Sequence, residues 1–131
     1  MKTIRIISIL FFIFILWIIY LANTVNNSMF FDFVKSLPFG DKIGHFILFG
    51  SLNFIGILSL KFKVISFKTI KLYKATMIVI IFVLIEEFSQ IFIANRTFDF
   101  IDLTADFIGI IISTYLATSI KKNFLKTTFS N

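Results

Sequence analysis

The side chains that can do chemistry in this chain gather in two stretches, residues 41–45 and residues 86–106. The chain has seven acids and one histidine, and six of the acids and the histidine lie in these stretches. Carboxylates, imidazole, amide and cationic groups can bind a polar headgroup, transfer protons or hold a hard cation. The candidate site residues are Asp41, Lys42, His45, Glu86, Glu87, Gln90, Arg96, Asp99, Asp102 and Asp106.

Helical spacing predicts that these residues share faces. Asp41 and His45 are four residues apart, and Glu86, Glu87 and Gln90 would occupy an arc of about 100° on one helix. A further stripe of acidic and small residues recurs at spacings of 3, 4, 3 and 4 within an apolar stretch: Asp99, Asp102, Asp106, Gly109 and Ser113. Such a stripe is expected to face other helices and not lipid.

The composition indicates a membrane protein. Of 131 residues, 58% are hydrophobic and 15% are charged, whereas soluble domains average about 45–50% and about 25%. This excludes an ordinary soluble domain and a disordered chain, and the absence of Cys excludes a disulfide scaffold. We predict an all-α membrane protein with one domain over residues 1–131 and four transmembrane helices, at about residues 4–22, 42–60, 75–93 and 100–120.

The first segment has an alternative interpretation. Lys2 and Arg5 followed by an apolar run also fit a secretory signal. Residues 6–22 are longer than the usual signal core, and no clear cleavage site follows, so a retained helix is favoured.

The basic residues predict the orientation. Ten of them fall on one side of the four segments: Lys2, Arg5, Lys61, Lys63, Lys68, Lys71, Lys74, Lys121, Lys122 and Lys126. Three fall on the other: Lys35, Lys42 and Arg96. The positive-inside rule therefore predicts cytoplasmic termini and an acidic cluster at the outer leaflet. It also explains the net charge of +6 without a nucleic-acid partner.

Two connections are expected at the membrane surface. The outer one is predicted to contain a short amphipathic helix at residues 28–37. The cytoplasmic one, residues 61–74, is either a topology signal only, which is favoured, or a second amphipathic helix on anionic lipid.

The energetics of buried charge require the acids to meet other groups. A charge at the bilayer centre costs about 2.5–3.5 kcal/mol, so Glu86, Glu87, Asp102 and Asp106 must be paired, protonated or hydrated. Arg96 is the expected partner of Glu87 or Asp102.

Some candidates have plain structural alternatives. Asp41 and Asp99 can be helix N-caps, Arg96 can bridge helices, and His45 and Gln90 can serve only in packing.

At these residues the sequence resembles the VanZ-like family of bacterial membrane proteins. The first family motif reads here Asp41-Lys42-Ile43-Gly44-His45-Phe46. The second matches at every spacing, and it reads Glu87, Gln90, Arg96, Asp99, Asp102, Asp106 and Gly109. Asp106 departs from the pattern, because the family usually has Asn there, and Glu86 is an acid outside the motif.

The resemblance implies a bacterial inner-membrane location and a connection with the cell envelope, since the family is named for a member linked to teicoplanin resistance. It supplies no reaction. Three functions stay open: binding or handling of an envelope lipid or glycan-precursor headgroup, which is favoured; a membrane-embedded carboxylate enzyme, with a divalent cation possible; and an accessory subunit whose polar cluster only holds helices together.

Overall fold

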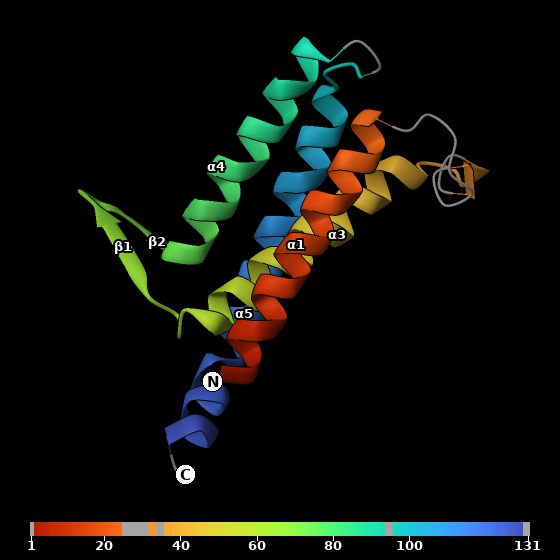
Figure 1. Cartoon of the computed structure of the whole chain (residues 1–131). Coiled ribbons are helices and arrows are strands. Elements are labelled where there is room, and N and C mark those ends of the chain that lie inside the picture. Colours follow the sequence, from red (N-terminus) through yellow and green to blue (C-terminus); the bar gives the residue numbers. More distant parts are fainter. Residues whose placement is uncertain (1, 25–31, 34–35, 94–95, 130–131) are drawn as a thin grey trace.

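The structure is a computed structural model, and it describes residues 2–24, 32–33, 36–93 and 96–129. It is mostly helical (Figure 1). The elements are α1 (Lys2–Thr24), α3 (Gly40–Ser59), β1 (Val64–Phe67), β2 (Ile70–Tyr73), α4 (Lys74–Ser89), the 3-10 helix η1 (Gln90–Phe92) and α5 (Phe100–Phe129).

Four helical segments are long and apolar enough to cross a membrane: Lys2–Asn23, Gly40–Ser59, Lys74–Phe92 and Phe100–Thr128. Many of their large apolar side chains point outward, and on α1 both Trp17 and Tyr20 are more than half exposed. Several of their acidic and amide side chains, in contrast, are buried. This distribution of apolar outside and polar inside suits a lipid environment and not water.

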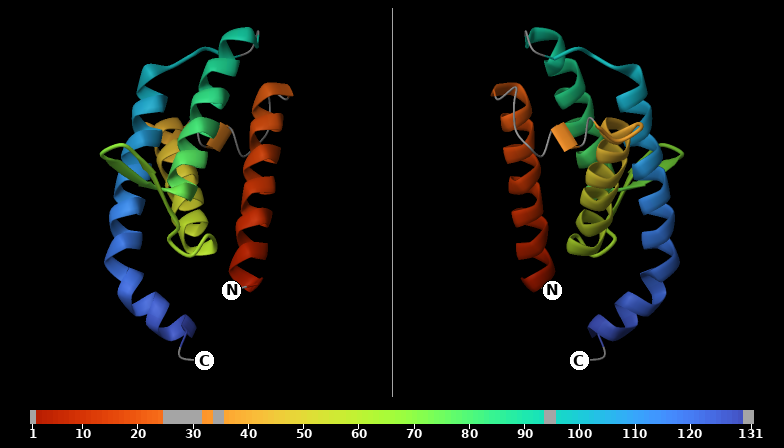
Figure 2. Two further views of the ribbon diagram at one scale, coloured as in Figure 1. Left: turned by 90° about the vertical axis from the view of Figure 1, so that its left-hand side faces the viewer. Right: turned by 90° about the vertical axis from the view of Figure 1, so that its right-hand side faces the viewer.

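The helices run alternately up and down, so the two termini lie at one end and the α4–α5 connection lies at the other (Figures 1 and 2). The most extensive helix contact joins α3 to α5, which are distant in sequence. Two glycines allow this close approach. A Cβ on Gly50 would lie 3.1 Å from the backbone oxygen of Gly109, and a Cβ on Gly109 would lie 2.5 Å from that of Phe46.

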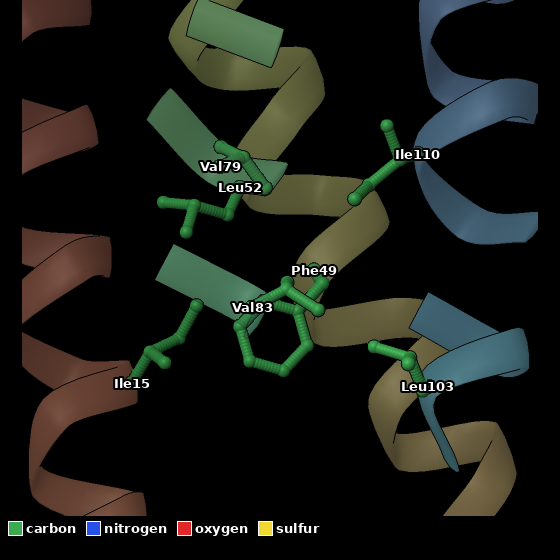
Figure 3. Close-up of a cluster of buried hydrophobic side chains, with 7 residues drawn as sticks. All are labelled: Ile15, Phe49, Leu52, Val79, Val83, Leu103 and Ile110. Carbon is green, nitrogen blue, oxygen red and sulfur yellow. The ribbon is translucent and has the colours of Figure 1, made fainter. Parts of the chain in front are cut away.

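The apolar core draws on all four long helices. Figure 3 shows its buried side chains, which are Ile15, Phe49, Leu52, Val79, Val83, Leu103 and Ile110. A second cluster, nearer the termini, contains Ile57, Phe62, Ala75 and Ala117. The first cluster fixes α3, α4 and α5 next to the acidic residues, because Phe49 and Leu103 are each one turn from a candidate site residue.

The connection at residues 61–74 rules out the less favoured of its two interpretations, the amphipathic helix, and it leaves the favoured one, a topology signal, as a prediction. It forms an antiparallel hairpin, in which Val64 pairs with Tyr73 and Phe67 with Ile70, and not an amphipathic helix. Left-handed backbone at Lys61 and Phe62 ends α3, and Lys68 in the same conformation makes the turn. The prediction of an all-α fold was therefore wrong in this small two-stranded sheet.

The observed helix boundaries differ less from the predicted ones. α5 continues to Phe129, nine residues past the predicted end, because Phe124 packs against Phe62 with ring centroids 5.8 Å apart. The third segment finishes as the 3-10 turn η1. The helix predicted at residues 28–37 falls mostly outside the described residues.

Candidate functional site

The candidate residues meet at the end of the bundle that lies away from the termini. The first turns of α3, the last turn of α4 and the first turns of α5 lie there (Figure 1). The connection between α4 and α5 is short, so these helices must be antiparallel neighbours, and α3 packs against both. Polar side chains from three helices are thereby directed toward one another.

Lys42 forms the outer layer of the site. Its Nζ lies 3.0 Å from Asp99 Oδ2, 3.1 Å from Asp102 Oδ1 and 3.5 Å from Asp41 Oδ2. One ammonium group thus serves three carboxylates. The Lys42 ammonium, together with the backbone N–H of Ile101, holds the pKa of Asp99 below its ordinary value.

The two N-cap alternatives have different outcomes. Asp99 accepts a hydrogen bond of 2.8 Å from the Ile101 N–H, as expected of a capping residue, in addition to its contact with Lys42. Asp41 is not a cap, because α3 begins at Gly40 and Phe39 occupies the cap position without a side-chain hydrogen bond.

His45 forms the inner layer. Its Nδ1 lies 2.9 Å from Asp106 Oδ1 and 3.5 Å from Glu87 Oε1, and its Nε2 lies 3.9 Å from Asp102 Oδ2. Glu87 and Asp106 are fully buried. Within the described part of the chain, neither Glu87 oxygen nor Asp106 Oδ2 has a hydrogen-bond partner.

Arg96 belongs to a separate arm of the site. Its Nη2 lies 3.8 Å from Glu86 Oε1, and its Nη1 donates to Asn23 Oδ1 of α1 at 3.2 Å. Gln90 donates to the same Glu86 oxygen at 2.9 Å. The expectation that Arg96 pairs with Glu87 or Asp102 is therefore wrong, since the structure places Lys42 on Asp102 and His45 beside Glu87.

The structure thus joins Asp41, Lys42, His45, Glu87, Asp99, Asp102 and Asp106 through ion pairs or hydrogen bonds, and it joins Glu86, Gln90 and Arg96 in the adjacent arm. Both parts share α4, where Glu86 and Glu87 are neighbours. Six acids are gathered around two permanently charged cations, Lys42 and Arg96, and one histidine.

Sequence reasoning missed Asn53, which is fully buried between α3 and α5. Its Nδ2 donates to Ser113 Oγ at 2.7 Å, to Thr114 Oγ1 at 2.9 Å and to the Ile110 carbonyl at 3.1 Å. Its spacing of eight residues from His45, two helical turns along the same face, was the available signal.

Two sets of three side chains have the donor atoms to hold a metal ion. One set is His45, Glu87 and Asp106, and the other is Asp41, His45 and Asp102. In each set the donor atoms lie within 4.8 Å of one another. Oxygen and imidazole nitrogen are common ligands of divalent metals.

An apolar surface groove of about 370 Å³ lies along the α3–α5 interface, and its lining includes Phe46, Gly50, Phe54, Gly109 and Ile112. Phe46 follows His45 directly, and Gly109 lies three residues after Asp106. The groove therefore begins within one helical turn of the inner layer.

No family model, no curated protein and no solved structure matches this chain.

Proposed function

We propose that this chain is a VanZ-like multi-pass protein of the bacterial cytoplasmic membrane whose acidic cluster binds a cell-envelope lipid or glycan-precursor headgroup at the outer leaflet. A role related to glycopeptide resistance is part of this proposal. The motif residues from Asp41 to Gly109 support the family, and the ten-to-three division of basic residues supports the orientation.

The observation that carries the proposal is a surplus of buried carboxylate at one end of an apolar bundle. Glu86, Glu87, Asp102 and Asp106 are each at most 6% exposed, and several of their oxygens have no hydrogen-bond partner within the described residues. Leaving a buried charged group unsatisfied costs upwards of about 1–3 kcal/mol, so the cluster favours a ligand that brings positive charge or hydrogen-bond donors. Sugar hydroxyls and amines of envelope precursors have this chemistry.

Two further features support a lipid ligand. Arg96, whose Nη2 lies 3.8 Å from Glu86, can meet a phosphate beside the acidic cluster, and most envelope lipids carry a phosphate. The apolar groove of α3 and α5 starts beside the cluster, so one lipid could place its headgroup on the cluster and an acyl or polyprenyl chain in the groove.

Binding is tested with the purified protein in nanodiscs and labelled lipids: a polyprenyl phosphate, phosphatidylglycerol and phosphatidylethanolamine. We expect saturable binding of one of them with one molecule per chain. Arg96→Gln should weaken binding at least tenfold, because it removes a cation from the site, whereas the exposed Asp32→Asn should leave it within twofold. If all three lipids bind weakly, and if they bind equally to Arg96→Gln and Asp32→Asn, the result would contradict the proposal.

A second candidate function has its own supporting observation. His45 Nδ1 lies between Asp106 and Glu87, which is an arrangement suited to proton transfer. A membrane-embedded enzyme would convert the labelled lipid, whereas a binding protein would retain it unchanged. Product analysis in the same experiment separates the two.

The orientation predicts labelling at two exposed positions. The chain has no cysteine, so single cysteines report without background. Thr97→Cys should react with a membrane-impermeant maleimide added to intact cells, and Lys68→Cys should react only after lysis. Labelling of position 68 in intact cells would place the cluster on the cytoplasmic side.

A further inference from the structure

His45 of α3, Glu87 of α4 and Asp106 of α5 converge in the inner layer of the site. We propose that these three side chains bind a divalent metal ion of the Mn²⁺ or Zn²⁺ type. This site lies beneath the proposed headgroup site, and it goes beyond that function because it requires no lipid.

The first argument is the state of Glu87. Its side chain is fully buried, and neither oxygen has a hydrogen-bond partner within the described residues, while Oε1 lies 3.5 Å from His45 Nδ1. Asp106 is also fully buried, and its Oδ2 is likewise without a partner there. A bound cation satisfies these oxygens where no donor of the described chain does.

The second argument is the separation of the donor atoms. Bonds of 2.0–2.2 Å to a common metal place neighbouring ligand atoms about 3.0–3.5 Å apart. His45 Nδ1 lies 2.9 Å from Asp106 Oδ1 and 3.5 Å from Glu87 Oε1. Two of the three separations therefore lie in or close to this range, and all three donor atoms lie within 4.8 Å of one another. A bound ion would take the place of the hydrogen bond between His45 Nδ1 and Asp106 Oδ1.

The charges favour the set of His45, Glu87 and Asp106 as the metal site. The other set of donors is Asp41, His45 and Asp102. Asp41 and Asp102 already have a cation, because Lys42 Nζ lies 3.5 Å and 3.1 Å from their oxygens. A metal there would compete with the ammonium group. Once they have lost their protons to a bound metal, the carboxylates of Glu87 and Asp106 supply two negative charges, which match a divalent ion with a neutral His45.

The ligand set also indicates the type of metal. Mg²⁺ and Ca²⁺ prefer oxygen ligands alone, whereas Mn²⁺ and Zn²⁺ accept imidazole with carboxylates. With Nδ1 on the metal, the His45 Nε2–H faces Asp102 Oδ2 at 3.9 Å. This distance is too long for a hydrogen bond, so the Asp102 carboxylate would act on the ring by its charge alone.

The wild-type protein provides the first test. After treatment with a chelator and desalting in non-ionic detergent, it is titrated with MnCl₂ by calorimetry. We expect one Mn²⁺ per chain, displacement by Zn²⁺, and at least tenfold weaker binding of Mg²⁺ and Ca²⁺. Electron spin-echo spectra of bound Mn²⁺ should show coupling to one imidazole nitrogen. Absence of stoichiometric binding, or of the nitrogen coupling, would overturn the proposal.

The variants assign the ligands. Glu87→Gln should weaken Mn²⁺ binding at least tenfold, since it removes a charged ligand. Glu86→Gln makes the same change at the neighbouring buried residue, and its Mn²⁺ affinity should stay within twofold of the wild-type value. The Mn²⁺ affinity of Asp41→Asn, which alters the set of Asp41, His45 and Asp102, should also stay within twofold. Circular dichroism verifies that each variant is folded. Binding by Glu87→Gln equal to that of the wild type, or a larger loss in Asp41→Asn, would refute this ligand assignment.

The metal proposal and the lipid proposal can be tested independently of each other. Metal binding is measured without added lipid, and lipid binding is repeated with a chelator present. Lipid binding that survives the chelator in a protein without metal affinity would leave the proposed function standing and remove the metal site.

Discussion

Gly109→Ala is expected to destabilise the protein more than alanine at Gly44, Gly50 or Gly56. The new Cβ would lie 2.5 Å from the backbone oxygen of Phe46, a rigid atom of the facing helix. The contact between α3 and α5 must open, and overpacking of this kind costs about 1–3 kcal/mol, with the upper end expected here. Thermal unfolding in detergent measures the loss as a lower midpoint.

The same substitution should also disturb the site. Asp106 lies three residues before Gly109 on α5, so an outward shift of α5 moves Asp106 from its 2.9 Å contact with His45. We therefore expect Gly109→Ala to weaken ligand binding as well as stability.

Gly44→Ala is the matched control. A Cβ at Gly44 would have no atom within 4 Å, so it lies in open space on α3, the helix that carries Phe46. Alanine favours a helix over glycine by up to about 1 kcal/mol, and Gly44→Ala should leave the midpoint unchanged or raise it. If the two alanine variants unfold at the same temperature, the close approach of α3 and α5 is not what stabilises the bundle.

Lys42→Met is expected to have the second large effect. It removes the only permanently charged cation within ion-pair distance of Asp41, Asp99 and Asp102 in the described structure, while keeping an unbranched side chain. Breaking a fully buried ion pair costs about 3–5 kcal/mol. Because the Lys42 side chain is 27% exposed, we expect a smaller loss of about 2 kcal/mol, measured by thermal unfolding at pH 7.

The pH dependence of this effect has a defined sign. Lys42 lowers the pKa of Asp99 in the folded protein, so their interaction stabilises fully above the ordinary pKa of an aspartate and is lost as the pH falls through the lowered value. The difference between wild type and Lys42→Met should therefore narrow in acid, below about pH 4. Lys42→Arg retains the charge and should recover most of the stability at pH 7. A difference that grows in acid would be evidence against this ion-pair account.

The sequence by itself determined the four apolar helices and the residues that gather at one end of them. Apolar runs of about 20 residues can satisfy their backbone groups only as helices, and this property is local. The stripe of Asp99, Asp102, Asp106, Gly109 and Ser113 also follows from helical spacing. The last four are buried as predicted, and Asp99, which precedes α5, is half-buried.

The tertiary structure decided which groups pair. Lys42 and Arg96 were both within reach of several acids, and the packing of α3 between α4 and α5 placed Lys42, not Arg96, on Asp102. For residues 61–74 the sequence favoured a topology signal over an amphipathic helix, and it did not predict the hairpin that the structure forms there. The hairpin formed because left-handed backbone at Lys61 and Phe62 ends α3 and returns the chain through a two-stranded pairing. Spacing along one helix fixes a face, but the choice among partners depends on distances between helices, which no single segment contains.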